Sequence, residues 1–293
     1  MIQPPKHQIA AVYHRRIGDI VVPALSDGTL TRDLEMMNGV PPALGRAFFD
    51  DAFRPGVVIS VNAFLIYSAG RMALIETGSG QYLGDTTGLL PDSLKAAGVA
   101  PTDIKTILLT HMHPDHSAGL TDMTTGAARY PEAELVMHEN EPRHWFDDAA
   151  MARGTDREKA LFFKAGREQV EPYRNRWRLF GREGEVFPGV TAIPATGHTP
   201  GHTTYLVTSG KERLLIWGDT VHSPAVQVPR PEVTMTVDTD HRAAAASRRR
   251  IFDMCASERL LVTGMHMHFP GFGHVARRGS TYEYVPEVWQ QTL

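Results

Sequence analysis

The strongest constraint on this chain is a cluster of metal-ligand side chains that follows directly on a buried strand. Residues 110–120 read THMHPDHSAGL, with three histidines and an aspartate in six consecutive positions. The apolar run 104–109 in front of them is typical of a buried strand, so the cluster stands at a strand's carboxyl end. So much ligand chemistry in one loop predicts a metal site.

The spacing within the loop divides its ligands into two pairs. His111 and His113 are two residues apart, so both imidazoles can point to one side of an extended loop. Asp115 and His116 lie beyond a proline and can point elsewhere. One short loop therefore offers two ligands to each of two metal ions. Because a catalytic site needs about three protein ligands per ion, the others must come from elsewhere.

Three further segments carry suitable residues at turn-rich strand ends. Nine of the 14 histidines lie in these segments, the opening loop and nearby His274, and packing alone would not cluster them in this way. Nitrogen and carboxylate donors without thiolate suit Zn²⁺, with Co, Mn or Fe as alternatives. The three segments are 196–202 (TGHTPGH), 217–222 (WGDTVH) and 263–268 (TGMHMH).

Composition excludes several other classes of protein. The 293 residues are 42% hydrophobic, enough to bury a full core, and we expect one domain over 1–293. The formal net charge is −3 and no stretch is basic enough for a run of phosphates, so no nucleic-acid partner is expected. We interpret Arg248, Arg249 and Arg250 as a solvated helix face. The single cysteine, Cys255, excludes a thiolate zinc cluster within one chain and is expected in a buried helix position.

The N-terminal sequence MIQPPKHQIAAVYHRR lacks the apolar segment and the small-residue cleavage site of a signal peptide. No window approaches the ~20 consecutive apolar residues that a membrane helix needs. We therefore expect a cytoplasmic protein with no membrane partner.

The order of elements predicts an α/β (α+β) fold with a two-sheet core flanked by helices. Residues 30–55 are expected to form a loop with short helices, and the end of the chain an irregular, glycine-rich tail. Strands are expected at 19–22, before a turn at 26–28, at 57–67 and 72–76 as a hairpin, and at 104–109, 134–137, 186–194, 203–207, 214–217 and 259–263; helices are expected at 89–97, 139–146, 157–170 and 239–255.

Taken together, the motifs resemble the metallo-β-lactamase superfamily. The opening loop has that superfamily's H-x-H-x-D-H pattern, and His198, Asp219 and His266 follow in the order of its remaining ligands. Four stretches look most like methyl parathion hydrolase and its lactonase-type relatives: ALSDGT (24–29), THMHPDHSAGL, GHTPGHT (197–203) and FPGFGH (269–274). The resemblance runs over nearly the whole chain and implies an αββα sandwich with a di-metal site at one edge.

The resemblance also implies a division of the ligands. His111, His113 and His198 would hold one ion, Asp115, His116 and His266 the other, and Asp219 would bridge them. His202 is expected to orient a neighbouring loop. Either His266 or His268 could reach the site, and the GMH context favours His266.

By the same resemblance, the function is hydrolysis of a small neutral lactone or aryl ester by a metal-bridging hydroxide. Asp115 and Asp219 would act at the reacting centre. His222 would either donate a hydrogen bond to the substrate carbonyl or serve only as a partner of Asp219. Trp145, Phe162 and Leu83 are expected to wall the substrate pocket, although the first two could be the apolar faces of helices.

Several alternatives stay open on sequence alone. A phosphotriester hydrolase of the methyl parathion type shares these ligands, and so does a glyoxalase-like thioesterase. The thioesterase should carry a basic C-terminal region, where this chain has only Arg277 and Arg278. A non-catalytic metal-binding module is a further alternative. The pocket has no obvious cationic clamp for a charged substrate, and we expect a homodimer.

Overall fold

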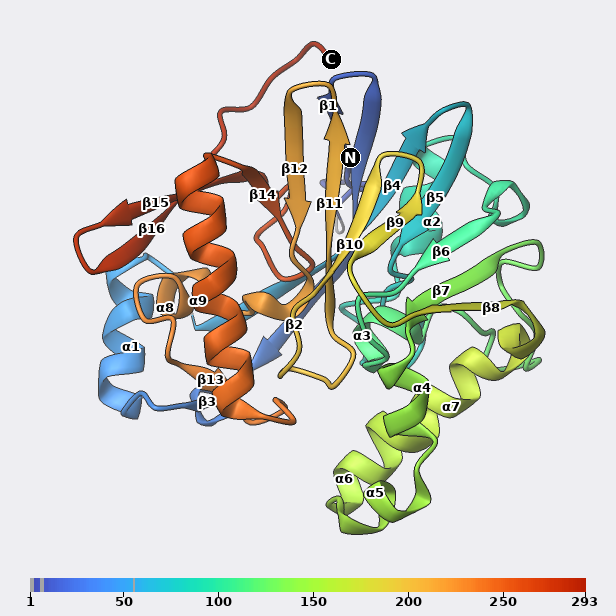
Figure 1. Ribbon diagram of the computed structural model, residues 1–293, viewed down its shortest axis with the longest axis horizontal. Coiled ribbons are helices and arrows are strands. Elements are labelled where there is room, and N and C mark those ends of the chain that lie inside the picture. Colours follow the sequence, from blue (N-terminus) through green and yellow to red (C-terminus); the bar gives the residue numbers. More distant parts are fainter. Residues whose placement is uncertain (1–2, 6–7, 55) are drawn as a thin grey trace.

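The two β-rich blocks of the sequence form two seven-stranded sheets in the computed structural model, which describes residues 3–5, 8–54 and 56–293 (Figure 1). The first sheet is antiparallel at one end and parallel from β5 to β8, and β4 and β5 form the expected hairpin. Its strands in spatial order are β1 (Val12–Ile17), β2 (Ile20–Arg32), β4 (Val57–Ser68), β5 (Arg71–Ile75), β6 (Thr106–Leu108), β7 (Glu134–His138) and β8 (Trp177–Phe180).

The second sheet contains one parallel pair, β12 with β14, among antiparallel neighbours. Its spatial order is β16 (Thr281–Pro286), β15 (Gly273–Arg278), β14 (Leu261–Thr263), β12 (Glu212–Ile216), β11 (Thr203–Ser209), β10 (Val190–Pro194) and β9 (Gly184–Phe187). A separate two-stranded ribbon pairs β3 (Met37–Asn38) with β13 (Thr234–Met235).

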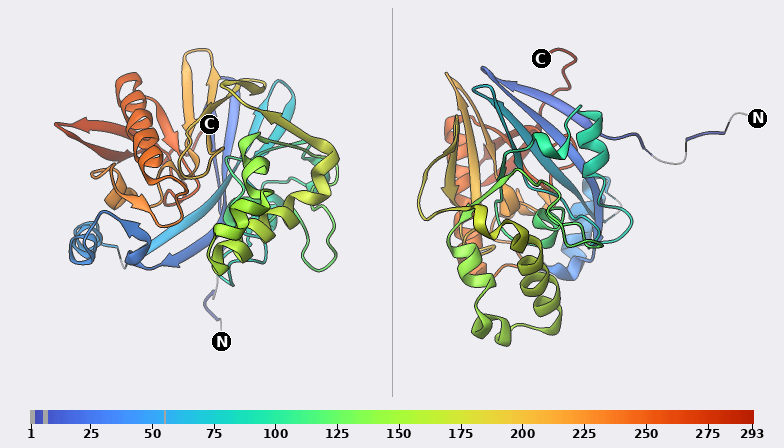
Figure 2. Two further views of the ribbon diagram at one scale, coloured as in Figure 1. Left: turned by 60° about the horizontal axis from the view of Figure 1, so that its bottom comes forward. Right: turned by 90° about the vertical axis from the view of Figure 1, so that its right-hand side faces the viewer.

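Helices cover the outer faces of both sheets (Figures 1 and 2). Three of the α-helices are α1 (Pro42–Asp51), α2 (Leu90–Ala96) and α3 (Pro114–Ser117). The segment from α4 to α7 projects beyond the sandwich and comprises α4 (Asn140–Trp145), α5 (Asp148–Arg153), α6 (Asp156–Glu158), a π-helical turn (Lys159–Lys164) and α7 (Ala165–Val170). The last two α-helices are α8 (Pro224–Gln227) and α9 (His241–Glu258).

Three apolar cores hold these layers together. Between the sheets, Phe64 of β4 belongs to the same buried cluster as Tyr205 of β11. On the outer faces, Leu94 of α2 packs in the cluster of the first sheet and Phe252 of α9 in that of the second. Because each sheet is apolar on both faces, it needs a partner on each side, and the αββα sandwich expected from the sequence is confirmed. Among the described residues, no helix is both long enough and apolar enough to span a membrane.

Two local expectations are wrong. Residues 26–28 are not a turn, because β2 runs through them with an irregularity in its pairing with β4. The Asp27 carboxylate accepts hydrogen bonds from the backbone N–H groups of Ser79, Gly88 and Leu90. Asp27 therefore stabilises the neighbouring loop and does not close a turn. The tail is not irregular either: β15 and β16 form a regular antiparallel hairpin. The stretch 30–55 contains, besides short elements, the ten-residue helix α1.

The arginine triplet is a third correction. Cys255 is buried in α9 as expected, but Arg248 on the same helix is only 1% exposed and is not part of a solvated face. Its guanidinium donates hydrogen bonds to the carbonyl oxygens of Thr220, Pro231 and Val233. Helix α9 is therefore tied by a buried cation to the loop that follows β12.

We expect Arg248→Met to lower the free energy of unfolding by roughly 2–5 kcal/mol, because three carbonyl groups lose their donor inside the protein. Arg249→Met is the matched control, since Arg249 is exposed and faces Glu232 only at 3.7 Å; its cost should be no more than about 0.5 kcal/mol. Urea unfolding of both variants measures the difference. Equal stability of the two variants would contradict the assigned role of Arg248.

Candidate metal centre

The candidate residues come from four loops that follow β6, β10, β12 and β14. The β6 strand runs parallel to β5, and β12 runs parallel to β14, so these carboxyl ends meet at one edge of the sandwich. Backbone hydrogen bonds join the loops there, from Thr203 N–H to Thr110 and from Trp217 N–H to Thr263. Ligands far apart in sequence are thereby brought to one place.

A glycine is required at two points of this edge. The φ angle of Gly197 is +130°, and a Cβ there would lie 2.1 Å from the backbone nitrogen of Ala244. The φ angle of Gly218 is +57°, and a Cβ there would lie 2.5 Å from the His202 ring. Both positions therefore exclude a side chain, and the residue that follows each one, His198 or Asp219, enters the centre.

The structure brings all seven predicted ligands together in two groups. His111, His113 and His198 lie in one group with Asp219, their ligand atoms all within 4.8 Å of one another. We call this the first half-site. Asp115, His116 and His266 form the other group within the same limit, which we call the second half-site.

In the first half-site three imidazole nitrogens face one another. The His198 Nε2 lies 3.0 Å from His113 Nδ1 and 3.2 Å from His111 Nε2. Its other nitrogen, Nδ1, is 2.7 Å from the Asp238 carboxylate, which can only accept, so the Nδ1 proton is held there. Ring nitrogens that converge in this way can share a metal ion, or one of them can donate a proton to the others when no ion is bound. Because burial lowers the pKa of His111 and His113 well below the usual value, their lone pairs suit a metal ion better than protons.

Asp219 lies between the half-sites. Its Oδ2 is 3.2 Å from His198 Nε2 and 3.2 Å from His266 Nε2, and its Oδ1 is 3.2 Å from His116 Nε2. His266 donates its Nδ1 proton to the Ser60 carbonyl, so its Nε2 is directed inward toward Asp219. His116 Nε2 and Asp219 Oδ1 are buried without a hydrogen-bond partner. These orphaned atoms fit a second ion held by the second half-site.

Charges in the centre set its proton affinity. Burial opposes protonation of His116, but the carboxylates of Asp219, Asp115 and Glu76 outweigh it and raise the pKa well above its usual value. Burial likewise opposes protonation of His198, yet hydrogen bonds to Asp219 and Asp238 raise its pKa to about 9. Protons on these histidines would balance the buried carboxylates in the metal-free chain, and bound metal ions would displace them.

His202 and His222 adjoin the ligands in different ways. His202 accepts the backbone N–H of Asp219 at its Nε2 and contacts the Ala195 carbonyl through Nδ1, so it orients the Asp219 loop. Burial lowers its pKa to about 3, in keeping with a neutral ring. The His222 Nε2 lies 3.0 Å from Asp219 Oδ2, and its ring stacks on His266 with centroids 5.1 Å apart. The structure thus makes His222 a direct neighbour of the Asp219 carboxylate.

The remaining predicted residues are distributed unevenly. His268 is half-buried and lies outside both half-sites, on a cavity beside Arg54. The Phe162 ring lies 4.4 Å from the His113 ring, centroid to centroid. Trp145 is buried, 5.4 Å from the same ring. Leu83 packs instead against the cluster around Leu30 and Val61.

Three buried carboxylates at the centre were not expected from the sequence. Asp238 holds His198, and Glu76 accepts the Thr110 N–H at 2.7 Å while lying 3.4 Å from His116. Glu141 accepts hydrogen bonds from both sides of the first half-site and is fully buried. Burial raises the pKa of Glu76 and Glu141, and the hydrogen bonds they accept act in the opposite direction.

One cation lies in the electrostatic neighbourhood of the second half-site. Burial lowers the pKa of the Arg32 guanidinium, and the negative charge of Asp115 acts in the opposite direction. Arg32 is therefore close enough to interact electrostatically with Asp115 of the second half-site. Arg277 and Arg278, in contrast, pair with Asp253 and Glu283 on the surface.

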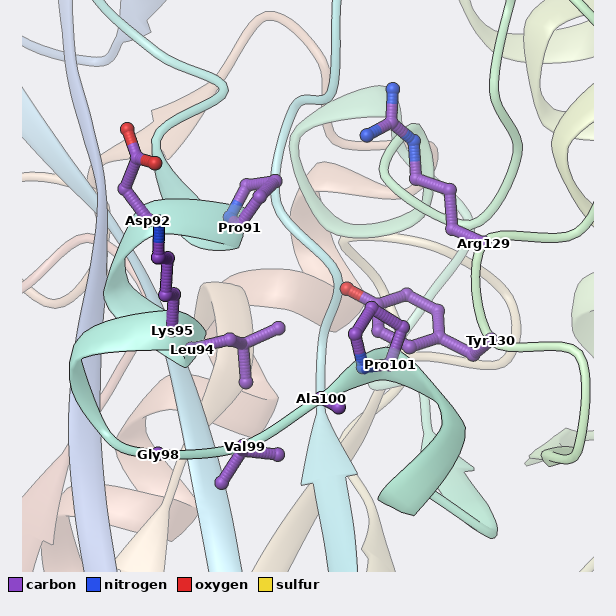
Figure 3. A pocket seen from close by; sticks show the side chains of 10 residues that line it. All are labelled: Pro91, Asp92, Leu94, Lys95, Gly98, Val99, Ala100, Pro101, Arg129 and Tyr130. Atoms are coloured by element: carbon purple, nitrogen blue, oxygen red, sulfur yellow. The ribbon is translucent and has the colours of Figure 1, made fainter.

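Cavity size does not locate the centre. A cavity of about 610 Å³ lies between α2 and residues 98–101 and 129–130, with Lys95 and Arg129 on opposite sides of it and the Tyr130 ring reaching between them (Figure 3). None of the predicted site residues lines it. A smaller cavity of about 250 Å³ adjoins the centre and is lined in part by Trp145, Phe162 and Asp238.

Several solved structures share this architecture. A hydrolase of the β-lactamase superfamily, AbOPH, matches with a TM-score of 0.91 and 29% identity, covering 97% of this chain and 100% of that one. AidC, a dizinc quorum-quenching lactonase in complex with a product, N-hexanoyl-L-homoserine, matches with a TM-score of 0.89, 24% identity and coverage of 97% and 99%. At that identity the second match shows the fold alone.

Sequence relatives agree over shorter regions. The N-acyl homoserine lactonase AiiB of Agrobacterium fabrum is 28% identical over 165 residues, which are 49% of this chain and 56% of that protein. An atrochrysone carboxyl ACP thioesterase of Passalora fulva is 27% identical over 161 residues, 55% of this chain and 38% of that protein. The chain thus matches well under two thirds of the length of these curated relatives.

A family model agrees with the fold and with the order of the ligand loops. The model of the metallo-β-lactamase superfamily matches residues 56–257, more than half of the chain. That region includes the opening histidine loop, His198 and Asp219. The chain therefore belongs to the metallo-β-lactamase superfamily.

Proposed function

We propose that this protein is a di-metal hydrolase that cleaves neutral lactones or aryl esters. The observation that carries the proposal is the convergence of buried imidazole nitrogens around the Asp219 carboxylate, a donor set that fits two divalent ions. The donor set of nitrogen and carboxylate without thiolate favours Zn²⁺. Matches to N-acyl homoserine lactonases support an ester-type substrate.

When bound, two divalent ions supply Lewis-acid chemistry, polarising an ester carbonyl and lowering the pKa of water. His111, His113 and His198 would hold one ion, Asp115, His116 and His266 the other, and Asp219 both. Asp115 keeps 16% exposure of its side chain, more than Asp219 at 2%, so it is the accessible carboxylate for accepting the proton released in the reaction.

The apolar surface beside the first half-site favours a neutral substrate. Phe162 is partly exposed and lies against His113, and Trp145 packs behind it, so the pair can form one wall for a ring or an acyl chain. Arg32 adds a cation near Asp115, which offers a partner to the carboxylate product of ester hydrolysis. The surface pairing of Arg277 and Arg278 leaves no basic C-terminal clamp for glutathione, which disfavours a glyoxalase-like thioesterase.

We expect reconstituted protein to bind two metal ions per chain, measured by elemental analysis after removal of excess metal. His266→Ala should lower the occupancy toward one ion, because His266 lies among the ligand atoms of the second half-site. His268→Ala is the matched control and should retain two ions. A wild-type stoichiometry that stays at one under metal excess, or a larger loss in His268→Ala, would contradict the proposed ligand set.

Asp219→Ala should be more damaging than loss of any single histidine. Removing the bridge leaves two cations facing each other without the intervening charge, and both half-sites lose a ligand. We expect kcat/KM to fall by about 1,000-fold or more, or some 4 kcal/mol of barrier. Steady-state kinetics and metal analysis on the same samples check this. Near-normal turnover with full metal content would show that Asp219 is not the bridge.

Neutral lactones and aryl esters should have the highest kcat/KM in a panel that also contains a phosphotriester and a glutathione thioester. His222→Leu should shift the ratio toward the phosphotriester, because it removes a polar ring from the centre and makes that wall apolar. A wild-type preference for the phosphotriester would establish the alternative function. A preference for the thioester would refute the proposal.

A further inference from the structure

Glu141 is the most heavily engaged carboxylate next to the centre. One oxygen, Oε2, accepts the backbone N–H of Met112 and the indole N–H of Trp145, each at 2.8 Å. The other, Oε1, accepts the backbone N–H of Gly201 at 2.9 Å and the hydroxyl of Thr199. All four partners donate, and the side chain is fully buried. Glu141 therefore acts as a four-way acceptor in the first turn of α4.

Two of these four partners are covalent neighbours of the first half-site. Met112 separates His111 from His113, and Thr199 directly follows His198. The loops after β6 and β10 come from different sheets, and Glu141 bonds to both. Its third partner, Trp145, packs against His113. One carboxylate thus fixes the backbone beside all three histidines.

The second half-site is held by different groups. Glu76 lies beside His116, and the Ser60 carbonyl accepts from His266. No hydrogen bond of Glu141 reaches a residue adjacent to Asp115 or His266 in the described parts of the chain. The two half-sites therefore depend on separate supports, although Thr110, which Glu76 holds, precedes His111.

We propose that Glu141 is a positioning residue that sets the geometry, and hence the metal affinity, of the first half-site without itself touching metal or substrate. The inference rests on the proposed di-metal centre. A glutamine at this position keeps the shape but replaces one acceptor oxygen by an NH₂ group. In either orientation of the side-chain amide, the NH₂ group faces two groups that donate to the carboxylate in the native protein. One of the two loops therefore loses its hydrogen bonds to this side chain.

The test is a zinc titration of metal-free protein in competition with a chelator of known affinity, which yields the two stepwise dissociation constants. Glu141→Gln should weaken one ion by about 10- to 100-fold and leave the other within about threefold of wild type. Glu139→Gln, the same change on the exposed residue two positions earlier, should alter neither. Thr199→Val removes a single donor to Glu141 and should weaken the same ion by less, which keeps the test open if Glu141→Gln fails to fold.

Two backgrounds identify the half-site that is affected. His266→Ala impairs the second half-site, so adding Glu141→Gln should weaken the remaining ion as it does in the otherwise native chain. His113→Ala impairs the first half-site, so the added substitution should leave the remaining ion unchanged. Equal effects in both backgrounds, or equal weakening of both ions, would reduce Glu141 to general support of the fold and overturn the proposal.

Metal binding and hydrolysis are separate readouts here. If wild-type protein binds two ions and Glu141→Gln weakens only one of them, but the wild type hydrolyses nothing in the panel, the proposed function fails and the role of Glu141 stands. If hydrolysis follows the expected order while Glu141→Gln binds both ions normally, the role of Glu141 fails and the function stands.

Discussion

The structure depends on one unfavourable juxtaposition that its surroundings stabilise. A carboxylate and several imidazoles are buried together, with ring nitrogens 3.0–3.2 Å apart. Burying such groups without compensation is costly, because the low local dielectric strengthens repulsion as much as attraction. The surrounding groups fix the outward nitrogens: Asp238 holds His198, and Ser60 holds His266. The inward nitrogens are left as a preformed set of ligands for cations.

The sandwich can tolerate the free-energy cost of burying these polar groups because the centre is built on rigid strand ends. The apolar cores between and outside the sheets supply the stability, whereas the loops at the edge are tied by polar contacts. His202 fixes the backbone of Asp219, and Arg248 fixes the carbonyl of Thr220 next to it. A short loop after β12 is thereby held from two sides. Such support keeps ligand positions from relaxing apart when the ions are absent.

The parts of the site that the sequence predicts are those encoded locally. The spacing of the opening loop and the turn residues around His198 and Asp219 predict the candidate ligands, and helical periodicity predicts α9. Glu141 and Asp238 could not be predicted in this way, since nothing near them in sequence marks them. Their partners in the histidine loops lie 29 to 60 residues from Glu141 and 40 residues from Asp238. The burial of Arg248 could not be predicted for a related reason. Its helix neighbours are arginines on the surface, and only the tertiary fold decides which of the three is buried.

The exposure of the ligands indicates where a substrate enters. The side chains of His111, His116 and His266 have no exposed surface, and those of His198 and Asp219 keep 4% and 2%. Asp115 keeps 16%, so solvent reaches the centre from its side, the side on which Arg32 contributes positive charge. In the first half-site, the Phe162 ring lies against His113. If the protein hydrolyses esters as proposed, the polar end of the substrate would pass Asp115 while its apolar part lies along Phe162, because this orientation leaves no charge facing the aromatic wall and no apolar surface facing the cation.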